Sequence, residues 1–289
     1  MANKKVLILG AKGMLGQELV QAFSRDGEYT VTAWDVDDVD VTDFVVAEKK
    51  IRILSPDSII NAIAYNAVDR CEESDEEYRK AMVLNAEVPG FLAHLAKKTD
   101  RIFVHYSTDY VFDGTNESGY AEDAEPRPLS CYGESKWAGE KNILAEAGRS
   151  YIIRLSKLFG KPAMSAIAKK SFFDMMLMIA KTKESVQAVD DEKSCFTYAP
   201  DLAEATKALI EDEAPYGVYH LPNSGSATWY EALQELYTQA EIGATIQSVG
   251  SDVFPRSAKR PHCSVLLNTK RPILRRYQEA LKEYLAHME

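Results

Sequence analysis

The feature that most constrains the fold is an apolar segment that runs directly into a glycine-rich turn. Val6-Leu7-Ile8-Leu9 is typical of a parallel strand buried on both faces. Gly10, Gly13 and Gly16 follow, and then a segment with helical periodicity, Gln17 to Phe23. This order is the setting of a dinucleotide site, because the glycines allow close backbone approach and the helix N-terminus offers N–H groups to a pyrophosphate. The spacing is G-x-x-G-x-x-G rather than G-x-G-x-x-G, and an ordinary glycine turn is the alternative.

Strands and helices alternate over the first half of the chain. Further apolar strands are predicted at Thr30–Trp34, 56–65, Arg101–Thr108 and Tyr151–Leu155. This alternation predicts an α/β fold with a doubly wound parallel sheet. In such sheets, ligands bind outside the carboxyl ends of the strands.

Four residues that follow predicted strands are expected to meet at that edge of the sheet. They are Gly10, Asp35, Ala62 and Thr108. Asp35 lies nineteen residues after Gly16, where an acid suits the ribose diol of a dinucleotide. A solvated loop acid is the alternative for Asp35.

Tyr132 and Lys136 are the candidate acid–base pair. Residues four apart lie on one face of a helix, so the phenol and the amine can converge on one site. A free tyrosine titrates near pH ~10, and a neighbouring ammonium is expected to lower that pKa toward the range useful for catalysis. Such a pair also occurs by chance on surface helices. Here the predicted strands that precede it, with residues expected to meet at one ligand-binding edge, favour an acid–base role.

Composition excludes several classes of function. The net charge of −10 argues against a nucleic-acid partner, which requires clustered Lys and Arg. The four cysteines and five histidines show no metal-like or disulfide-like spacing, so no metal site is predicted from the residues. No signal peptide and no apolar run of membrane-spanning length is found, and we expect a cytoplasmic protein without a membrane partner.

Six segments together resemble the extended short-chain dehydrogenase/reductase family, and within it the reductases of 4-keto sugar nucleotides. They are Gly10–Gly16, Asp35 with Asp40–Asp43, Asn61–Asp69, Ser107–Gly114, Tyr132–Glu140 and Lys259–Leu266. The likeness covers almost the whole chain, and Ser-Thr-Asp-Tyr-Val-Phe-Asp-Gly is its most specific match.

The resemblance implies a Rossmann domain with a smaller C-terminal substrate-binding domain. The expected NAD(P)-binding domain spans residues 1–156 with a returning segment at about 186–222, and residues 157–185 and 223–289 form the substrate-binding domain. The implied activity is NADPH- or NADH-dependent reduction of the 4-keto group of a nucleotide-activated deoxysugar, with dTDP-4-dehydro-L-rhamnose as the expected substrate.

The resemblance also assigns site residues. Tyr132 would protonate the carbonyl oxygen, Lys136 would lower its pKa and hold the nicotinamide ribose, and Thr108 would bind the reacting oxygen or the tyrosine. The remaining cofactor contacts are expected at Gly10, Gly13, Met14, Leu15, Gly16, Asp35, Asp40, Val41, Ala62, Ile63, Ala64, Tyr65 and Ser107. Substrate contacts are expected at Thr108, Asp109, Tyr110, Lys157, Arg256 and Arg260.

The substrate wall departs from the family pattern. Lys157 stands where the family has a tryptophan, Met14 replaces a glutamine, and the 191–197 turn lacks its glycine and proline. We expect Lys157 to point to solvent and leave a wider sugar pocket; the alternative is that it reaches the diphosphate beside the basic loop of Arg256 and Arg260. The alternative for the loop of Arg256 and Arg260 is a solvated segment that binds no diphosphate.

Three further possibilities stay open at this point. Some family members hold a divalent metal such as Mg²⁺ at a dimer contact, and Glu18 occupies a matching acidic position; a homodimer is possible. The chain is alternatively an epimerase or dehydratase of the same extended family, or a non-catalytic NAD(P)-binding regulatory subunit. Tyr110 after Asp109 argues against a dehydratase, and the retained Thr108, Tyr132 and Lys136 argue against a regulatory subunit.

Overall fold

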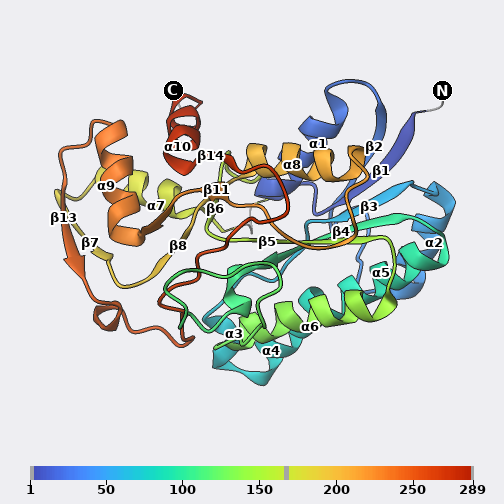
Figure 1. Cartoon of the computed structure of the whole chain (residues 1–289), viewed down its shortest axis with the longest axis horizontal. Coiled ribbons are helices and arrows are strands. Elements are labelled where there is room, and N and C mark those ends of the chain that lie inside the picture. Colours follow the sequence, from blue (N-terminus) through green and yellow to red (C-terminus); the bar gives the residue numbers. More distant parts are fainter. Residues whose placement is uncertain (1–2, 166–168, 288–289) are drawn as a thin grey trace.

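The predicted α/β fold is confirmed by the computed structural model, which describes residues 3–165 and 169–287. Its centre is a sheet of six parallel strands in the order β10-β5-β4-β3-β1-β2 (Figure 1). The strands are β1 (Lys4–Leu9), β2 (Tyr29–Trp34), β3 (Ser58–Asn61), β4 (Ile102–Thr108), β5 (Ser150–Leu155) and β10 (Gly217–His220).

The order of the strands places a ligand crevice beside β1. From β1 the chain moves outward to β2 and then returns to β3 on the other side of β1, so the direction of winding reverses there. Doubly wound sheets bind ligands at this reversal, outside the carboxyl ends of the strands. The turns after β1 and β3 therefore border the expected cofactor site.

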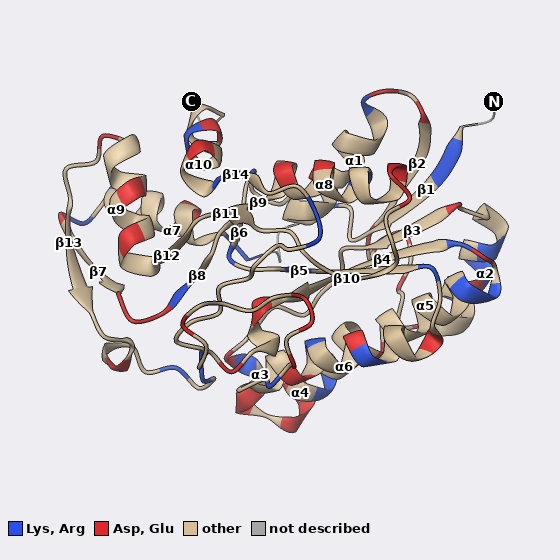
Figure 2. Ribbon diagram, viewed as in Figure 1, with Lys and Arg blue, Asp and Glu red and all other residues tan. Residues whose placement is uncertain are grey.

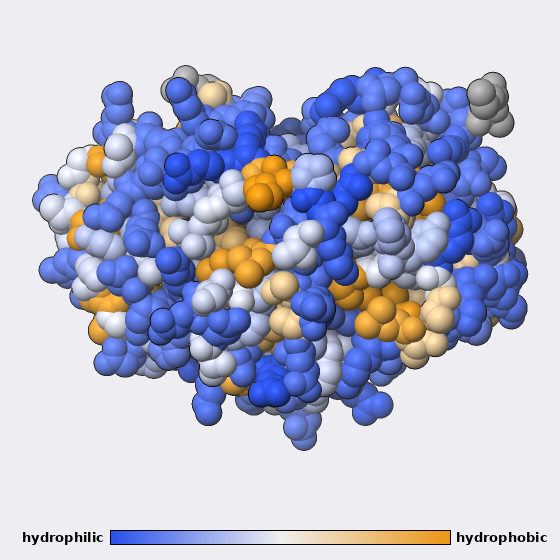
Figure 3. Space-filling model, in the orientation of Figure 1, coloured by the Kyte–Doolittle hydropathy of each residue, from blue (hydrophilic) through white to orange (hydrophobic). Residues whose placement is uncertain are grey.

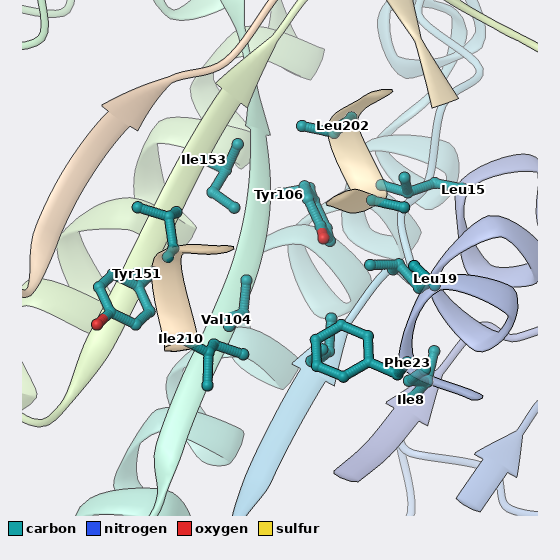
Figure 4. Packing of buried hydrophobic residues seen from close by; sticks show 14 of the residues in the cluster. Ile8, Leu15, Leu19, Phe23, Val104, Tyr106, Tyr151, Ile153, Leu202 and Ile210 are labelled. Carbon is teal, nitrogen blue, oxygen red and sulfur yellow. The ribbon is translucent and has the colours of Figure 1, made fainter. Parts of the chain in front are cut away.

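Helices cover both faces of the sheet, with α1 and α8 on one face and α5 and α6 on the other (Figure 1). The helices of this part are α1 (Met14–Ser24), α2 (Phe44–Leu54), α3 (Arg70–Glu73), α4 (Asp75–Met82), α5 (Val88–Lys98), α6 (Cys131–Glu146) and α8 (Ala199–Glu211), with a π-helical turn at Val83–Glu87 and a 3₁₀ turn at Asp109–Val111. Figure 4 shows the α1 and α8 face, where Leu19, Phe23 and Leu202 pack against the strands. Burial of these apolar side chains fixes α1 against the sheet.

A second group of elements follows β5. It contains β6 (Leu158–Phe159), α7 (Phe172–Ala180), β7 (Ser185–Val189), β8 (Lys193–Cys195), β9 (Thr197–Tyr198), β11 (Asn223–Ser224), β12 (Ser226–Thr228), α9 (Trp229–Gln239), β13 (Thr245–Val249), a 3₁₀ turn at Ser251–Val253, β14 (Leu274–Arg276) and α10 (Tyr277–Ala286). Its aromatic core includes Phe173, Phe196 and Tyr284. Within the expected returning segment, α8 and β10 pack with the large sheet, whereas β7 pairs with β13 in this second group. The division into two domains stays a prediction.

The surface carries both signs of charge. Figure 2 shows acidic residues gathered around α3 and α4, among a few basic ones, and basic residues gathered on α2. On the face drawn in Figure 3, apolar side chains form small areas separated by hydrophilic ones. Among the described residues, no helix is both long enough and apolar enough to span a bilayer.

The close packing of α1 on the end of β1 can be tested at Gly16. An added Cβ there would lie 2.0 Å from the Gly10 carbonyl oxygen and 2.8 Å from the Ala11 Cα. We expect Gly16→Ala to lower the free energy of unfolding by about 1–3 kcal/mol, because the backbone must shift to admit the methyl group. Urea unfolding measures this change. Gly243→Ala is the matched control, since nothing lies within 4 Å of the added atom; equal stability of the two variants would contradict the packing described.

Candidate active site

Helix α6 places Tyr132 and Lys136 together at the carboxyl end of β4. The helix begins at Cys131, after the Ser130 hydroxyl accepts a hydrogen bond from the Gly133 N–H at 3.2 Å. Such a cap satisfies a free amide of the first turn and fixes the helix start. Tyr132 and Lys136 are both buried, one turn apart.

The ammonium of Lys136 is held by the sheet. Its Nζ donates a hydrogen bond to the Tyr106 carbonyl oxygen in β4 at 2.6 Å. Burial lowers the pKa of Lys136 from 10.5 to about 8, and the Glu140 carboxylate opposes that shift. An amine with this pKa exchanges protons near neutral pH more readily than a surface lysine.

The pKa of Tyr132 is raised in this structure, so the expected lowering by Lys136 is wrong here. Burial is the main cause, and the Asp109 carboxylate acts in the same direction. The side chain that lowers the pKa of Tyr132 is Thr108, at the end of β4. A neutral phenol beside a hydroxyl is suited to donate a proton.

A buried ion pair lies beneath these residues. Arg154 of β5 donates through Nε and Nη2 to the two oxygens of Glu140, at 2.9 and 2.7 Å, and both side chains are at most 3% exposed. The Ser107 hydroxyl donates to the same carboxylate at 2.5 Å. Ser107, expected to contact the cofactor, is therefore bonded inside the protein. Sequence reasoning missed the roles of Glu140 and Arg154, although Glu140 lies four residues after Lys136.

The glycine turn after β1 packs closely against the segment that follows β3. Gly10 has a φ of +77°, and a Cβ there would lie 3.1 Å from the backbone of Ala62 and Ile63. Gly13 precedes α1 without a side-chain cap, which leaves the first turn of the helix open to an anion. Met14, Leu15 and Gly16 form that first turn. These features fit the dinucleotide expected from the sequence.

A pocket of about 300 Å³ adjoins this turn. Its lining includes Ala11, Lys12, Val20, Ala33, Asp35 and Asp38. The Asp35 carboxylate accepts hydrogen bonds from the backbone N–H groups of Lys12 and Val36, each at 2.9 Å. The Lys12 ammonium pairs with Asp37, which raises the pKa of Lys12. The lining of the pocket thus combines apolar side chains with two carboxylates and one ammonium.

The other expected cofactor residues lie on two neighbouring loops. Asp40 accepts hydrogen bonds from the backbone and hydroxyl of Thr42, which lower its pKa, and Val41 is buried in the core. After β3 come Ala62, Ile63, Ala64 and Tyr65. Asn85 in the π-helical turn holds this last segment, since its Oδ1 accepts from the Tyr65 N–H at 2.9 Å and its Nδ2 donates to the Tyr65 carbonyl at 3.0 Å. Asn85 is another residue that the sequence reasoning did not assign to the site.

The expected substrate residues after β4 are partly committed to the protein itself. The buried Asp109 carboxylate accepts from the Ser264 hydroxyl at 2.6 Å and from the Thr108 hydroxyl at 3.1 Å. Burial raises the pKa of Asp109 and Ser264 opposes this. The ring of Tyr110 meets that of Tyr132 edge-to-face, with centroids 5.9 Å apart. Tyr110 therefore shapes the space beside the Tyr132 phenol.

Lys157 does not point to solvent, and that expectation is wrong. Its Nζ is buried, 3.7 Å from the ring centroid of Trp229 and 4.9 Å from that of Phe196. Burial lowers the pKa of Lys157, and the Asp109 carboxylate opposes this. Two aromatic side chains distant in sequence enclose the amine, which is why the local sequence gave no sign of its burial.

The basic loop is also paired within the chain. Arg256 forms an ion pair with Glu192, and both Nη atoms of Arg260 donate to the carboxylate of Asp69, at 2.6 and 2.5 Å. Arg260 lowers the pKa of Asp69 to about 2. Both guanidinium groups are therefore already bound to carboxylates of the protein. A substrate diphosphate would have to share them with Glu192 and Asp69 or displace these carboxylates.

The residues around Glu18 do not fit a magnesium site within one chain. Glu18 is buried, and burial raises the pKa of its carboxyl. The side chains that oppose this shift are basic, Lys161 and His287. In the described part of the chain, no group of three or more His, Cys, Asp or Glu side chains is arranged to hold a metal.

The burial of Lys136 predicts a specific dependence of stability on pH. Its pKa is 10.5 when unfolded and about 8 when folded, so between these values the unfolded chain binds more protons. Below pH 8, burial of the charged Lys136 lowers the free energy of unfolding, and this loss disappears as the pH rises toward 10.5. We expect the free energy of unfolding of the wild type, relative to Lys136→Met, to rise by about 3 kcal/mol across that window. Urea unfolding of both proteins at several pH values measures it; a constant or falling difference would contradict the shift.

Comparison with known proteins places the chain in a family. Residues 4–289 match the family described as "RmlD substrate binding domain". The spore coat polysaccharide biosynthesis protein SpsK of Bacillus subtilis is 34% identical over 287 residues, which cover 97% of this chain and 96% of that protein. A probable dTDP-4,6-dihydroxy-2-methyloxan-3-one 4-ketoreductase of Streptomyces antibioticus is 34% identical over 285 residues, covering 96% of this chain and 93% of the relative.

A solved structure agrees with this match. The dTDP-4-dehydrorhamnose reductase of Bacillus anthracis, solved in complex with NADP, superposes with a TM-score of 0.92 at 29% sequence identity. The superposition covers 99% of this chain and 100% of that structure. The chain belongs to the RmlD substrate binding domain family of sugar-nucleotide reductases.

Proposed function

We propose that this protein uses NADH or NADPH to reduce the 4-keto group of a dTDP-activated deoxysugar. The observation that carries the proposal is that Tyr132, Lys136 and Thr108 lie together at the carboxyl end of β4, at the same edge of the parallel sheet as the glycine turn after β1. The similar reductase solved with NADP supports the cofactor. The first candidate substrate is dTDP-4-dehydro-L-rhamnose, and the different sugars implied by the names of the relatives make a panel of 4-keto sugars necessary.

The reduction requires a proton at the carbonyl oxygen of the sugar. The bound nicotinamide supplies the hydride to carbon. Tyr132 holds the proton that the oxygen needs, and its raised pKa keeps it protonated at neutral pH. The Thr108 hydroxyl lies beside Tyr132 and donates to Asp109 in this structure. By turning its proton from Asp109 to Tyr132, it would stabilise the phenolate that remains after transfer.

Lys136 then serves as the route by which the phenolate regains its proton. Its pKa of about 8 is close to neutral pH, and its position one helical turn from Tyr132 keeps it near the site. Glu140 and Arg154 position α6 against β5 and exclude water beneath the reacting groups. The cofactor would be held by the turn at Gly10–Gly16, by Asp35 and by the segment Ala62–Tyr65.

Tyr132→Phe tests the proton donor. We expect the variant to bind NADH as the wild type does and to lose at least about a hundredfold in kcat, the scale of a missing general acid. Stopped-flow reduction of dTDP-4-keto-6-deoxysugars measures the rate. Tyr216→Phe is the control, because this substitution also removes a tyrosine hydroxyl group, but from an exposed residue. A Tyr132→Phe enzyme with wild-type kcat would overturn the mechanism.

The same assay separates the alternatives. An epimerase or dehydratase converts the sugar without net consumption of NADH, and a non-catalytic subunit binds cofactor without turnover. A reductase is expected to oxidise one equivalent of NADH for each equivalent of 4-keto sugar that it converts. The homodimer and the cytoplasmic location stay predictions, and size-exclusion chromatography would measure the first.

The pocket beside β2 favours NADH over NADPH. Asp35 and Asp38 line this pocket and Asp37 lies between them in the sequence. Of the nearby cations, Lys12 is paired with Asp37 and Lys50 donates to the Asp38 carbonyl oxygen. A 2′-phosphate brings about two further negative charges into this acidic surrounding, whereas a ribose diol donates hydrogen bonds to a carboxylate. Both cofactors are expected to bind.

Asp37→Asn tests this assignment. The substitution removes one carboxylate and frees Lys12, so we expect the ratio of the Kd for NADPH to the Kd for NADH to fall by about three- to tenfold, or ~1 kcal/mol. Isothermal titration calorimetry of wild type and variant measures the ratio. Asp75→Asn makes the same charge change on α4 and should leave it unchanged. Tighter NADPH than NADH binding by the wild type, with no change in Asp37→Asn, would contradict the reading of this pocket.

A further inference from the structure

The segment Lys161–Ser165, here called the strap, is hydrogen-bonded to the glycine turn and to α1. It comes between β6 and α7, in the part of the chain expected to bind the substrate, and it contains none of the cofactor contacts expected from the sequence. We propose that the strap is part of the cofactor site and that Met164 covers the adenosine end of the bound dinucleotide. The inference rests on the proposed function and adds a binding element to its cofactor site.

Main-chain groups hold the strap against the glycine turn. The Lys12 carbonyl oxygen accepts a hydrogen bond from the Met164 N–H at 3.0 Å and another from the Ser165 N–H at 3.2 Å. The N–H of Lys12 donates to the Asp35 carboxylate at 2.9 Å. Lys12 therefore links the strap directly to the acid that is expected to bind the ribose diol.

Helix α1 holds the strap at a second place. The Gln17 side chain donates through Nε2 to the carbonyl oxygens of Lys161 and Pro162, at 2.9 and 3.0 Å. The strap is thus bonded near both of its ends, although it comes much later in the sequence than the residues that hold it. These hydrogen bonds fix the main chain at Met164, which lies between the two sets of contacts.

The side chain of Met164 lines the pocket of about 300 Å³ beside the glycine turn. The other apolar side chains of this lining are Ala11, Val20 and Ala33, and Asp35 is one of its carboxylates. Met164 is 67% exposed, so a ligand in the pocket has direct access to it. The volume is at the lower end of the range for ligand pockets, which suits one end of a dinucleotide rather than the whole molecule.

The position of the pocket in the sheet indicates which end of the cofactor it binds. The nicotinamide must lie beside Tyr132, at the carboxyl end of β4, and β3 separates β4 from β1 in the sheet. The pocket lies beside β1 and β2, where Asp35 matches the acid that binds the adenosine ribose. The adenosine end is therefore the one that reaches Met164.

The chemistry of methionine suits this contact. Its unbranched thioether chain is flexible and polarisable, adapts to flat apolar surfaces and makes favourable contacts with aromatic rings. In the free protein most of the Met164 side chain is in water. A bound adenosine would remove part of that apolar surface from water, which favours binding.

Met164→Ala tests the contact. Isothermal titration calorimetry should be used with ADP-ribose, which contains the adenosine end, and with reduced nicotinamide mononucleotide, which lacks it. We expect the Kd for ADP-ribose to rise by about three- to tenfold, because apolar contact area is lost, and the Kd for the mononucleotide to stay unchanged. Met178→Ala is the control, since it makes the same change at an exposed methionine of α7 outside the pocket.

Gln17→Met tests the strap, because methionine keeps the length of glutamine but lacks its N–H donors. Loss of the hydrogen bonds to Lys161 and Pro162 should raise the Kd for ADP-ribose by about two- to fivefold. In the double variant, the Kd should equal that of Met164→Ala alone, because the strap acts on the ligand through Met164. Independent effects of the two substitutions would contradict this role of the strap.

An unchanged Kd for ADP-ribose in Met164→Ala would overturn the proposal, and a lower Tm with that result would show that the strap only supports the fold. An equal rise in Kd for both ligands would overturn the placement of Met164 at the adenosine end. Failure of the reductase itself would appear separately, as absence of NADH oxidation with any 4-keto sugar while ADP-ribose binding still responds to Met164→Ala.

Discussion

The buried ion pair between Glu140 and Arg154 joins α6, which carries Tyr132 and Lys136, to the sheet. Both side chains are almost fully excluded from water, and two hydrogen bonds link them. Breaking such a pair leaves a buried charge uncompensated, at a cost of about 3–5 kcal/mol. The same carboxylate accepts from Ser107 and acts on Lys136 one turn away. The positions of β4, β5 and α6 relative to one another therefore depend on this contact.

Local patterns were sufficient to predict the fold and to place Tyr132 and Lys136 one turn apart on a helix, whereas their catalytic role stays a prediction. A strand buried on both faces, a glycine turn and an amphipathic helix leave few architectures open, and the six-stranded parallel sheet confirms the expected class. Tyr132 and Lys136 share a helix, so their separation of one turn follows from helical geometry alone. Features that depend on residues close together in the sequence could therefore be predicted from it.

Contacts between distant segments could not be read in this way. Lys157 is enclosed by Phe196 and Trp229, which come from other elements, and its local sequence carries no sign of this burial. Arg260 forms an ion pair with Asp69, which lies 191 residues earlier in the sequence. The arginine of a loop that suggested a phosphate site is therefore bound to a carboxylate of the protein. The pKa of Tyr132 likewise depends on burial by the whole fold rather than on the nearest cation.

The central claim is that the site at the carboxyl edge of the sheet delivers a hydride to C4 of a nucleotide sugar. The most direct measurement uses NADH deuterated at the nicotinamide C4, with a dTDP-4-keto-6-deoxysugar as substrate, followed by NMR and mass spectrometry of the sugar product. The account predicts one deuterium in the product, bound to C4 of the sugar, with a new hydroxyl group on that carbon. Deuterium at another carbon, or a product formed without deuterium from the cofactor, would contradict it.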